Sequence, residues 1–233
     1  MVNMKHIILA KNAPDRAKYT LENMGYTVTE SFCLDNVQPP LAYHPDMQLV
    51  QCGKCWICAP QCMEYYKPVF EKLSIPLLCG EKNPGYSYPE DVAYNVAVTG
   101  KYALHNYKYT DTVFADNCPY IPVDVKQGYA KCSVCVVGDS AVITSDAGIC
   151  KAASAAGIDT LHISAGNVSL PGYDYGFIGG ASGFADGWLL FCGDVAQHPD
   201  YTMIDAFCKK HSVQIVSLFP GNLVDVGTII AIG

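Results

Sequence analysis

His44 and Asp46 are the pair of residues whose types and spacing are best suited to chemistry. They stand two positions apart ahead of an apolar segment, and side chains two apart on an extended strand lie on one face. A carboxylate offers two oxygens to the N–H groups of a cation. An imidazole and a carboxylate on one face could therefore meet one small cationic substrate. The plainer interpretation is that His44 opens a strand after a loop and is simply solvated.

Five glycines indicate which elements position this pair. Gly53, Gly100, Gly138, Gly187 and Gly227 follow one another at intervals of about 40 to 50 residues, the range of repeat architectures. Short apolar runs precede and follow each glycine, which is typical of a β-hairpin that turns at the glycine. A helical pattern and a third short strand usually come next. The sequence therefore predicts five ββαβ units, with helices near 14–24, 61–73, 146–156 and 199–211 and a short one near 111–116.

The two ends of the chain are complementary. The N-terminal part supplies a helix and a strand without a full hairpin before them, and the C-terminal part ends in a hairpin without a helix after it. Joining them would complete a fifth unit and close a ring. We therefore expect residues 1–233 to form a single domain of the α/β class, a five-bladed ββαβ β/α propeller with pseudo-fivefold symmetry.

A polar residue occurs five positions before each glycine. These residues are Gln48, Asn95, Ser133, Ser182 and Asn222. Because the neighbouring positions are mostly apolar and side chains alternate along a strand, we expect the polar ones to face the axis of the ring. Asp46 and Lys131 come seven before their glycines, and His44 and Asp91 come nine before. Two interpretations stay open: a ligand site at the axis, or a hydrated pore whose side chains satisfy one another and water.

Two stretches resemble the pentein superfamily, the β/α propeller of guanidine-modifying enzymes. Residues 44–49, His-Pro-Asp-Met-Gln-Leu, are similar to the family's His-x-Asp followed by an apolar strand, and residues 179–190 are similar to its Glu-Gly-Gly element with a downstream Asp-Gly turn. The resemblance in architecture covers essentially the whole chain. It implies that His44 is a general acid/base and that Asp46 holds a guanidinium through two hydrogen bonds. Asp91, level with His44 on the next unit, would orient or acidify the site.

The chain departs from the family pattern at the nucleophile and at an acid. A covalent guanidine-modifying mechanism needs a cysteine thiolate that faces the axis, and no unit has cysteine five positions before its glycine. Cys132 misses that position by one residue, which turns a side chain to the opposite face of a strand unless a bulge re-aims it. Ile178 stands where the acid of the Glu-Gly-Gly element is expected. Ser133 or Ser182 would need a positioned base to act instead.

Three functions are compatible with these residues. The first is a pentein-like protein that lacks the usual nucleophile and binds a small polar ligand, with guanidino and amidine compounds as candidates, in the central channel. Its ligand-binding residues would be Asp46, Gln48, Asn95, Lys131, Ser133, Ser182 and Asn222. The second is an active guanidine-modifying hydrolase or transferase that uses His44 and Cys132, assisted by Asp91. The third is a non-enzymatic interaction protein whose pore is only structural.

A cysteine cluster offers a rival site. Cys52, Cys55, Cys58 and Cys62 have the spacing of a bacterial ferredoxin cluster. However, Met63 replaces the usual proline, and Cys55 to Cys58 coincide with a predicted strand, where an extended backbone cannot fold several ligands around one metal. We therefore expect no metal and no cofactor, and an iron–sulfur or zinc site remains the minor alternative.

The composition limits the partners. The 233 residues carry a net charge of −7 without a basic cluster, which argues against nucleic acid. No stretch approaches the length of a membrane span, and the start of the chain has too few apolar residues for a signal peptide. Twelve cysteines without such a signal favour a reducing cytoplasm. The long tyrosine-rich loops 80–89 and 165–176 are candidates for a lid or a protein contact, and the oligomeric state is not predicted.

Overall fold

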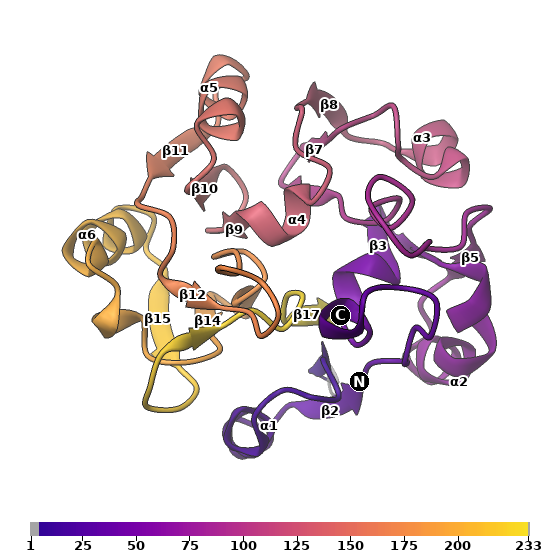
Figure 1. The fold of residues 1–233 in the computed structure, drawn as a ribbon, viewed down its shortest axis with the longest axis horizontal. Coiled ribbons are helices and arrows are strands. Elements are labelled where there is room, and N and C mark those ends of the chain that lie inside the picture. The colour runs from indigo at the N-terminus through magenta and orange to yellow at the C-terminus, as the bar shows by residue number, and fades with distance from the viewer. Residues whose placement is uncertain (1–4, 233) are drawn as a thin grey trace.

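A computed structural model describes residues 5–232 and shows a mixed α/β fold. Within these residues, five three-stranded sheets share one construction, in which the central strand is antiparallel to one neighbour and parallel to the other. The sheets lie around the middle of the molecule, and most of the helices lie outside them (Figure 1).

The sheets are β17–β1–β2 (Ile230–Ile232, His6–Leu9, Thr27–Glu30), β3–β4–β5 (Leu49–Cys52, Cys55–Cys58, Leu77–Cys79), β6–β7–β8 (Ala97–Thr99, Tyr102–His105, Ile121–Asp124), β9–β10–β11 (Val134–Val136, Ala141–Thr144, Asp159–His162) and β13–β14–β15 (Ser182–Ala185, Trp188–Phe191, Gln214–Ser217). Two further short strands, β12 (Val168–Ser169) and β16 (Leu223–Val224), pair in parallel.

A helix connects the central strand of each sheet to the strand that runs parallel to it. These helices are α1 (Asp15–Asn23), α2 (Met63–Leu73), α3 (Thr112–Asn117), α5 (Ala147–Ala155) and α6 (Tyr201–Lys210). All five lie where the sequence predicts them, and α3 is short as expected. Single 3₁₀ turns also occur: η1 (Pro39–Leu41), η2 (Pro45–Met47), η3 (Pro60–Cys62) and η4 (Val195–Gln197). A one-turn helix, α4 (Ala130–Ser133), lies near the middle of the molecule (Figure 1) and was not expected.

Four of the five predicted hairpins are confirmed. Gly53, Gly100, Gly138 and Gly187 each lie between paired antiparallel strands and have φ values of 61°, 51°, 73° and 81°. Glycine occupies this left-handed region without the steric cost that a Cβ brings. The glycine spacing therefore located these turns because the backbone needs that residue there.

The fifth predicted hairpin, around Gly227, is wrong. Its two arms pair with different partners: β16 pairs with β12, and β17 pairs with β1. The sheet that contains β17 has β1 as its central strand, and the sequence analysis missed this strand. Ile7 and Ile8 in β1 are 0% exposed, because the strand has a neighbour on each side and a helix over it. The terminal segments do form one sheet, as expected, but they meet through β1 rather than through a C-terminal hairpin.

The apolar cores lie between the sheets and their helices. Tyr66 and Phe70 of α2, for example, are almost fully buried against β3 and β4. None of the helices described is long and apolar enough to cross a membrane.

One buried carboxylate ties α3 to the loop that precedes β6. Asp111 is 0% exposed, and its Oδ1 accepts a hydrogen bond from Val113 N at the start of α3. Its Oδ2 accepts from the backbone N–H groups of Glu81 and Lys82 and from the Tyr94 hydroxyl. Three backbone N–H groups thus depend on one side chain, since the Tyr94 hydroxyl has a closer acceptor in Lys82 O at 2.6 Å.

We predict that Asp111→Ala lowers the free energy of unfolding by about 3 kcal/mol or more, because several buried donors lose their acceptor. Urea denaturation measures the loss. Asp146→Ala is the matched control: Asp146 caps α5 through a single bond to Ile149 N, so its loss should cost about 1 kcal/mol. Equal losses in the two variants would contradict the assignment.

Candidate functional site

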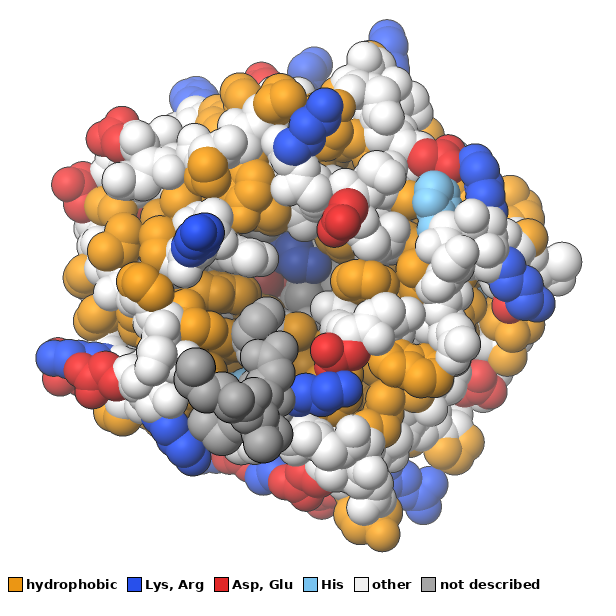
Figure 2. Space-filling view, turned by 180° about the vertical axis from the view of Figure 1, so that it is seen from behind, with side chains coloured by type: hydrophobic (Ala, Val, Ile, Leu, Met, Phe, Trp, Pro, Cys, Tyr) orange, Lys and Arg blue, Asp and Glu red, His pale blue; other side chains and the backbone are white. Residues whose placement is uncertain are grey.

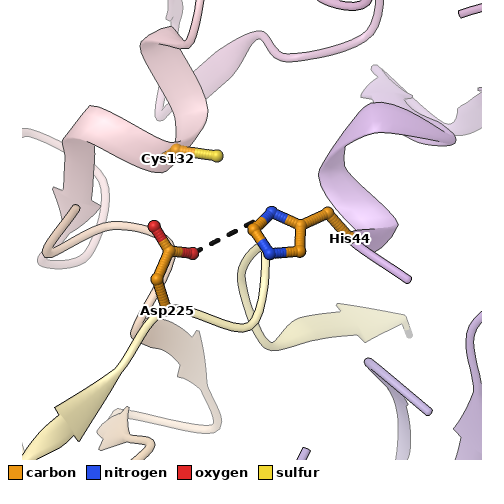
Figure 3. A group of neighbouring side chains, drawn as sticks. All are labelled: His44, Cys132 and Asp225. Atoms are coloured by element: carbon orange, nitrogen blue, oxygen red, sulfur yellow. Dashed lines mark ion pairs between the residues drawn. The ribbon is translucent and has the colours of Figure 1, made fainter. Parts of the chain in front are cut away.

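Three potential catalytic side chains meet in the middle of the molecule. His44 precedes η2, Cys132 lies in α4, and Asp225 follows β16. One nitrogen of His44, the sulfur of Cys132 and one oxygen of Asp225 all lie within 4.8 Å of one another. Figure 3 shows the three side chains converging from different segments, with the His44–Asp225 pair marked. All three residues are buried, so ligands and charges here act with little screening by water.

The thiol of Cys132 is held by two polar side chains. It donates to Asp46 Oδ2 at 2.9 Å and accepts from Asn95 Nδ2 at 3.2 Å. Asn95 also accepts, through Oδ1, from the backbone N–H groups of Lys131 and Cys132. One amide therefore fixes the turn of α4 and contacts the sulfur that the turn presents.

The environment favours the protonated thiol in the ligand-free protein. Burial raises the pKa of Cys132 well above its ordinary value of 9.0, and the negative charges of Asp46 and Asp225 raise it further. The hydrogen bond from Asn95 opposes this shift, because an N–H donor stabilises the thiolate. In the ligand-free protein the Cys132 thiol is therefore a poor nucleophile near neutral pH.

Asp46 has one satisfied oxygen and one free oxygen. Its Oδ2 accepts from Cys132 and, at 2.8 Å, from the Thr228 hydroxyl, whereas its Oδ1 is buried without a hydrogen bond. Thr228 has φ 75°, which is costly for a β-branched residue. Its N–H is fixed by Gly180 O at 2.8 Å. Strained backbone is thus retained where it aims a hydroxyl at the Asp46 carboxylate.

Asp225 is the second carboxylate of the site. Its Oδ2 accepts from Phe177 N and its Oδ1 from Gly227 N, and Oδ1 lies 4.0 Å from His44 Nδ1. Burial raises the pKa of Asp225, and the neighbouring His44 lowers it. His44 Nδ1 is itself buried without a hydrogen bond. The site therefore presents two unsatisfied atoms, His44 Nδ1 and Asp46 Oδ1, to whatever enters.

Glycines let these segments approach one another. A Cβ at Gly180 would lie 2.0 Å from Asp225 Oδ1, and a Cβ at Gly227 would lie 2.3 Å from His44 Cβ. Gly227 also has φ 67°. No other residue fits either position without displacing a side chain of the cluster.

The remaining predicted residues divide between the site and its surroundings. Asp91 is buried beside α4, where its Oδ2 accepts from the Tyr129 hydroxyl at 2.5 Å and its Oδ1 has no partner. Burial raises the pKa of Asp91. Ser133 is buried with an unpartnered hydroxyl. Lys131 is half-buried and lines a cavity that also reaches Asp46.

The predicted ring of five polar side chains is not formed. Gln48 turns under α2, where it bonds the Tyr66 hydroxyl and Phe32 O. Ser182 bonds Gly179 O within its own turn, and Asn222 is exposed away from the cluster. For Gln48 and Ser133 the reason is local: η2 and α4 place helical turns directly before β3 and β9, so strand alternation does not extend back to them. Asn222 lies in the segment of the incorrect fifth hairpin.

The same reason corrects the expectation for Cys132. The sequence analysis assigned residues 131–133 to a strand and therefore turned Cys132 away from the site. Residues 130–133 form α4 instead, and successive side chains on a helix point about 100° apart rather than to opposite faces. The helical turn α4 thus directs the Cys132 side chain toward the site, as a bulge in a strand would also have done.

The four cysteines with ferredoxin-like spacing do not converge on one point among the described residues. Cys52 faces Cys55 across the β3–β4 hairpin, while Cys58 faces Cys79 of β5. Among residues 5–232, no group of three potential ligands includes Cys52, Cys55, Cys58 or Cys62.

Asp225 and Thr228 are the site residues that the sequence analysis missed. Both were assigned to the incorrect fifth hairpin. A carboxylate inside the apolar run Leu-Val-Asp-Val, residues 223–226, was the available indication, because a charge in a buried strand needs partners.

Comparisons with known proteins identify the family and the fold of this chain. A family model described as a family of unknown function (DUF6873) matches residues 8–230. No protein with a curated description matches.

Solved structures that resemble this chain include two of dimethylarginine dimethylaminohydrolase (DDAH) and one amidinotransferase. A mutant of DDAH from Pseudomonas aeruginosa, complexed with citrulline, has a TM-score of 0.53 at 9% identity and covers 92% of this chain and 91% of that chain. A DDAH adduct with 4-chloro-2-hydroxymethylpyridine has a TM-score of 0.52 at 9% identity and covers 92% of each chain. SxtG, an amidinotransferase from Microseira wollei in the saxitoxin biosynthetic pathway, has a TM-score of 0.52 at 10% identity and covers 96% and 94%. These neighbours are penteins, so the resemblance seen in the sequence is confirmed for the fold.

We predict that Gly180→Ala destabilises the protein by about 2 kcal/mol or more, because the added methyl group overlaps the Asp225 carboxylate. Urea denaturation gives the free energy of unfolding. Gly148→Ala, on an exposed turn of α5, is the control: its Cβ meets only the flexible Asp146 carboxylate, at 3.1 Å, so stability should change by no more than about 1 kcal/mol. If Gly180→Ala matched the control, the close approach of residue 180 to Asp225 would be refuted.

The pH dependence of Cys132 alkylation follows from its raised pKa. With a neutral reagent such as iodoacetamide, the rate in the ligand-free protein should still rise with pH above 9.0, since the thiolate is a small fraction below the raised pKa. Asp46→Asn removes a negative charge beside the sulfur, so the curve should move to lower pH. Mass spectrometry of the Cys132 peptide measures the rate. Asp91→Asn removes a buried carboxylate that does not bond the sulfur, and an equal shift in that variant would argue against a specific effect of Asp46.

Proposed function

The chain belongs to the family of unknown function DUF6873 and has the fold of the pentein superfamily. From this premise we propose that it is a five-bladed β/α propeller that modifies a small guanidino or amidine compound through Cys132. The observation that carries the proposal is the convergence of Cys132, His44 and Asp225 within 4.8 Å, with Asp46 bonded to the sulfur. A single domain built from the whole chain, closed by the pairing of β17 with β1, is part of this proposal.

The charges of the site suit a planar cation. Asp46 and Asp225 are buried carboxylates, and His44 is the one basic side chain of the cluster formed with Cys132. A guanidinium presents several N–H donors in one plane, which match carboxylate oxygens. Asp46 Oδ1, buried and without a partner, is available for such a donor. Asp46 therefore anchors the cation in this proposal, with Asp225 as a second acceptor.

Binding of the cation also prepares the nucleophile. In the ligand-free site the Cys132 thiol donates to Asp46, and two carboxylates disfavour its ionisation. A guanidinium that pairs with these carboxylates offsets their charge and lies against the sulfur, so the pKa of Cys132 falls. The thiol proton passes to His44, and Asn95 stabilises the thiolate that remains. The protein thus keeps its thiol unreactive until a cation of the right shape is present.

The chemical step transfers the amidino carbon to sulfur. The Cys132 thiolate attacks the central carbon of the cation and forms a C–S bond, while the C=N electron pair moves onto nitrogen. One C–N bond then breaks, and the leaving amine takes its electron pair together with the proton held by His44. A covalent amidino-thioether remains on Cys132. Water, deprotonated by His44, attacks it in a hydrolase, and an acceptor amine does so in a transferase; the C–S bond breaks and the sulfur leaves as thiolate.

A second function has an observation in its favour. The raised pKa of Cys132 and its bond to Asp46 also suit a protein that binds a guanidino or amidine compound without turning it over. In that case the thiol is a hydrogen-bond donor to the anchor carboxylate and never a nucleophile.

Labelling with 2-chloroacetamidine distinguishes the two functions. Its amidinium is anchored by Asp46 and its chloromethyl carbon faces the sulfur, so Cys132 should be alkylated at least about tenfold faster than by neutral chloroacetamide, the preference that one charge-assisted contact supports. Asp46→Asn should remove this preference. Mass spectrometry locates the adduct. Cys135→Ser, which removes a buried thiol on β9, should leave the labelling unchanged.

Turnover is tested on a panel of guanidino and amidine compounds by detection of ureido products and released amine. Cys132→Ser should lower the rate for any accepted compound by about a thousandfold or more, with Cys135→Ser close to the parent. Ligand-induced stabilisation without turnover and without selective labelling supports the binding protein instead. Absence of stabilisation, labelling and turnover together would contradict both functions.

A further inference from the structure

A cavity on the face drawn in Figure 2 lies beside the cluster that contains Cys132. This face is hollowed near its centre, and a cavity of about 280 Å³ is lined there by the hairpin ends of several sheets. Its walls include Trp56, Val98 and Phe184, and its polar groups include Lys131, Asp46 and Thr228. Asp46 and Thr228 are almost completely buried, so they form the inner end of the cavity.

Two groups of opposite charge are left without partners in this cavity. Within residues 5–232, the ammonium of Lys131 forms no hydrogen bond and no ion pair, although the backbone on either side of it is fixed by Asn95. Asp46 Oδ1 is also unpartnered. The charge of Asp46 acts on Lys131, whose pKa is lowered by burial, but the two do not come within ion-pair distance of each other. Polar groups that are enclosed without a partner favour any ligand that satisfies them.

The signs of these charges limit the ligand. A simple anion that pairs with Lys131 would face the carboxylate of Asp46, and a simple cation that pairs with Asp46 would face the ammonium of Lys131. A molecule with both signs satisfies both groups without adding net charge to a partly buried site. The aromatic and aliphatic walls add a preference for an apolar substituent.

We propose that this cavity binds a small zwitterion with an apolar side chain, of the class of apolar α-amino acids, with its carboxylate on Lys131 and its ammonium on Asp46 Oδ1. The volume is sufficient, because a cavity of ~150 Å³ in another protein holds benzene, and about 280 Å³ leaves space for a head group as well. This proposal does not depend on the proposed chemistry at Cys132, but both use Asp46 Oδ1, so an amino acid and a guanidinium would compete for it.

The test is isothermal titration calorimetry of the full chain with L-phenylalanine and L-leucine, compared with phenylacetate and phenethylamine, which each carry one of the two charges. We expect both amino acids to bind at least about tenfold more tightly than either single-charge analogue, since each analogue loses one charge-assisted contact. Glycine, which lacks the apolar side chain, should bind more weakly than either amino acid.

Lys131→Met retains the length of the side chain and removes its charge. It should weaken phenylalanine binding at least about tenfold, whereas Lys126→Met, at an exposed position outside the cavity, should leave it unchanged. If Lys131→Met fails to fold, the analogue series on the parent protein decides alone.

The proposal is overturned if neither amino acid binds at about 10 mM, if phenylacetate or phenethylamine binds as tightly as phenylalanine, or if a folded Lys131→Met variant binds phenylalanine like the parent. Labelling of Cys132 by 2-chloroacetamidine is measured separately. Its presence or absence reports on the proposed chemistry, so the failure of one proposal is distinguishable from the failure of the other.

Discussion

The single turn of α4 is the constraint on which both proposed sites depend. Two contacts clamp it: the Asn95 side chain accepts from the N–H groups of Lys131 and Cys132, and Gly180 N donates to Cys132 O at 2.8 Å. The turn sends Cys132 toward His44 and Asp46 and directs Lys131 into the neighbouring cavity. In an extended strand these adjacent side chains would point to opposite faces, and only one of them could lie close to Asp46.

The Asp46 carboxylate contacts the Cys132 thiol and would also contact the proposed ligands. One oxygen accepts from the Cys132 thiol and the Thr228 hydroxyl, and the other is free. A buried carboxylate with an open oxygen is costly, and a second carboxylate, Asp225, lies nearby. Two carboxylates therefore lie beside the Cys132 sulfur. Burial, together with the charges of Asp46 and Asp225, keeps the Cys132 thiol protonated, and an entering cation would offset those charges.

Much of the fold could be predicted from the sequence, because its turns impose a residue type. Gly53, Gly100, Gly138 and Gly187 occupy left-handed turns, and the runs on either side of them form the paired strands. Gly227 was wrongly assigned to a fifth hairpin turn, because glycine is required there for a different reason, the close approach of His44. A glycine pattern shows where a Cβ is not tolerated, and it does not distinguish a hairpin from a contact between distant segments.

The site was less predictable, because it is built outside regular strands. His44 and Asp46 both lie beside Cys132, but not because of the strand alternation that the sequence suggested, since residues 45–47 form the helical turn η2. Gln48 was misplaced under the same assumption, since it turns toward Tyr66. Cys132 was judged to face away although it donates to Asp46. One turn of helix before a strand is too short to produce a hydrophobic period of its own, so no pattern in the sequence separates it from the strand that follows.

Ile178 stands where the sequence motif leads one to expect an acid, and a carboxylate from another segment lies nearby. Asp225 accepts from Phe177 N, and its Oδ1 occupies the space that a Cβ on Gly180 would need. A carboxylate therefore lies against the Gly179–Gly180 pair even though residue 178 is apolar and buried. Because electrostatic interactions act through space, a carboxylate from a different segment of the chain can still place negative charge beside His44. With neighbours only 9% to 10% identical, the chemistry is better judged from which charges surround the sulfur than from which positions carry them.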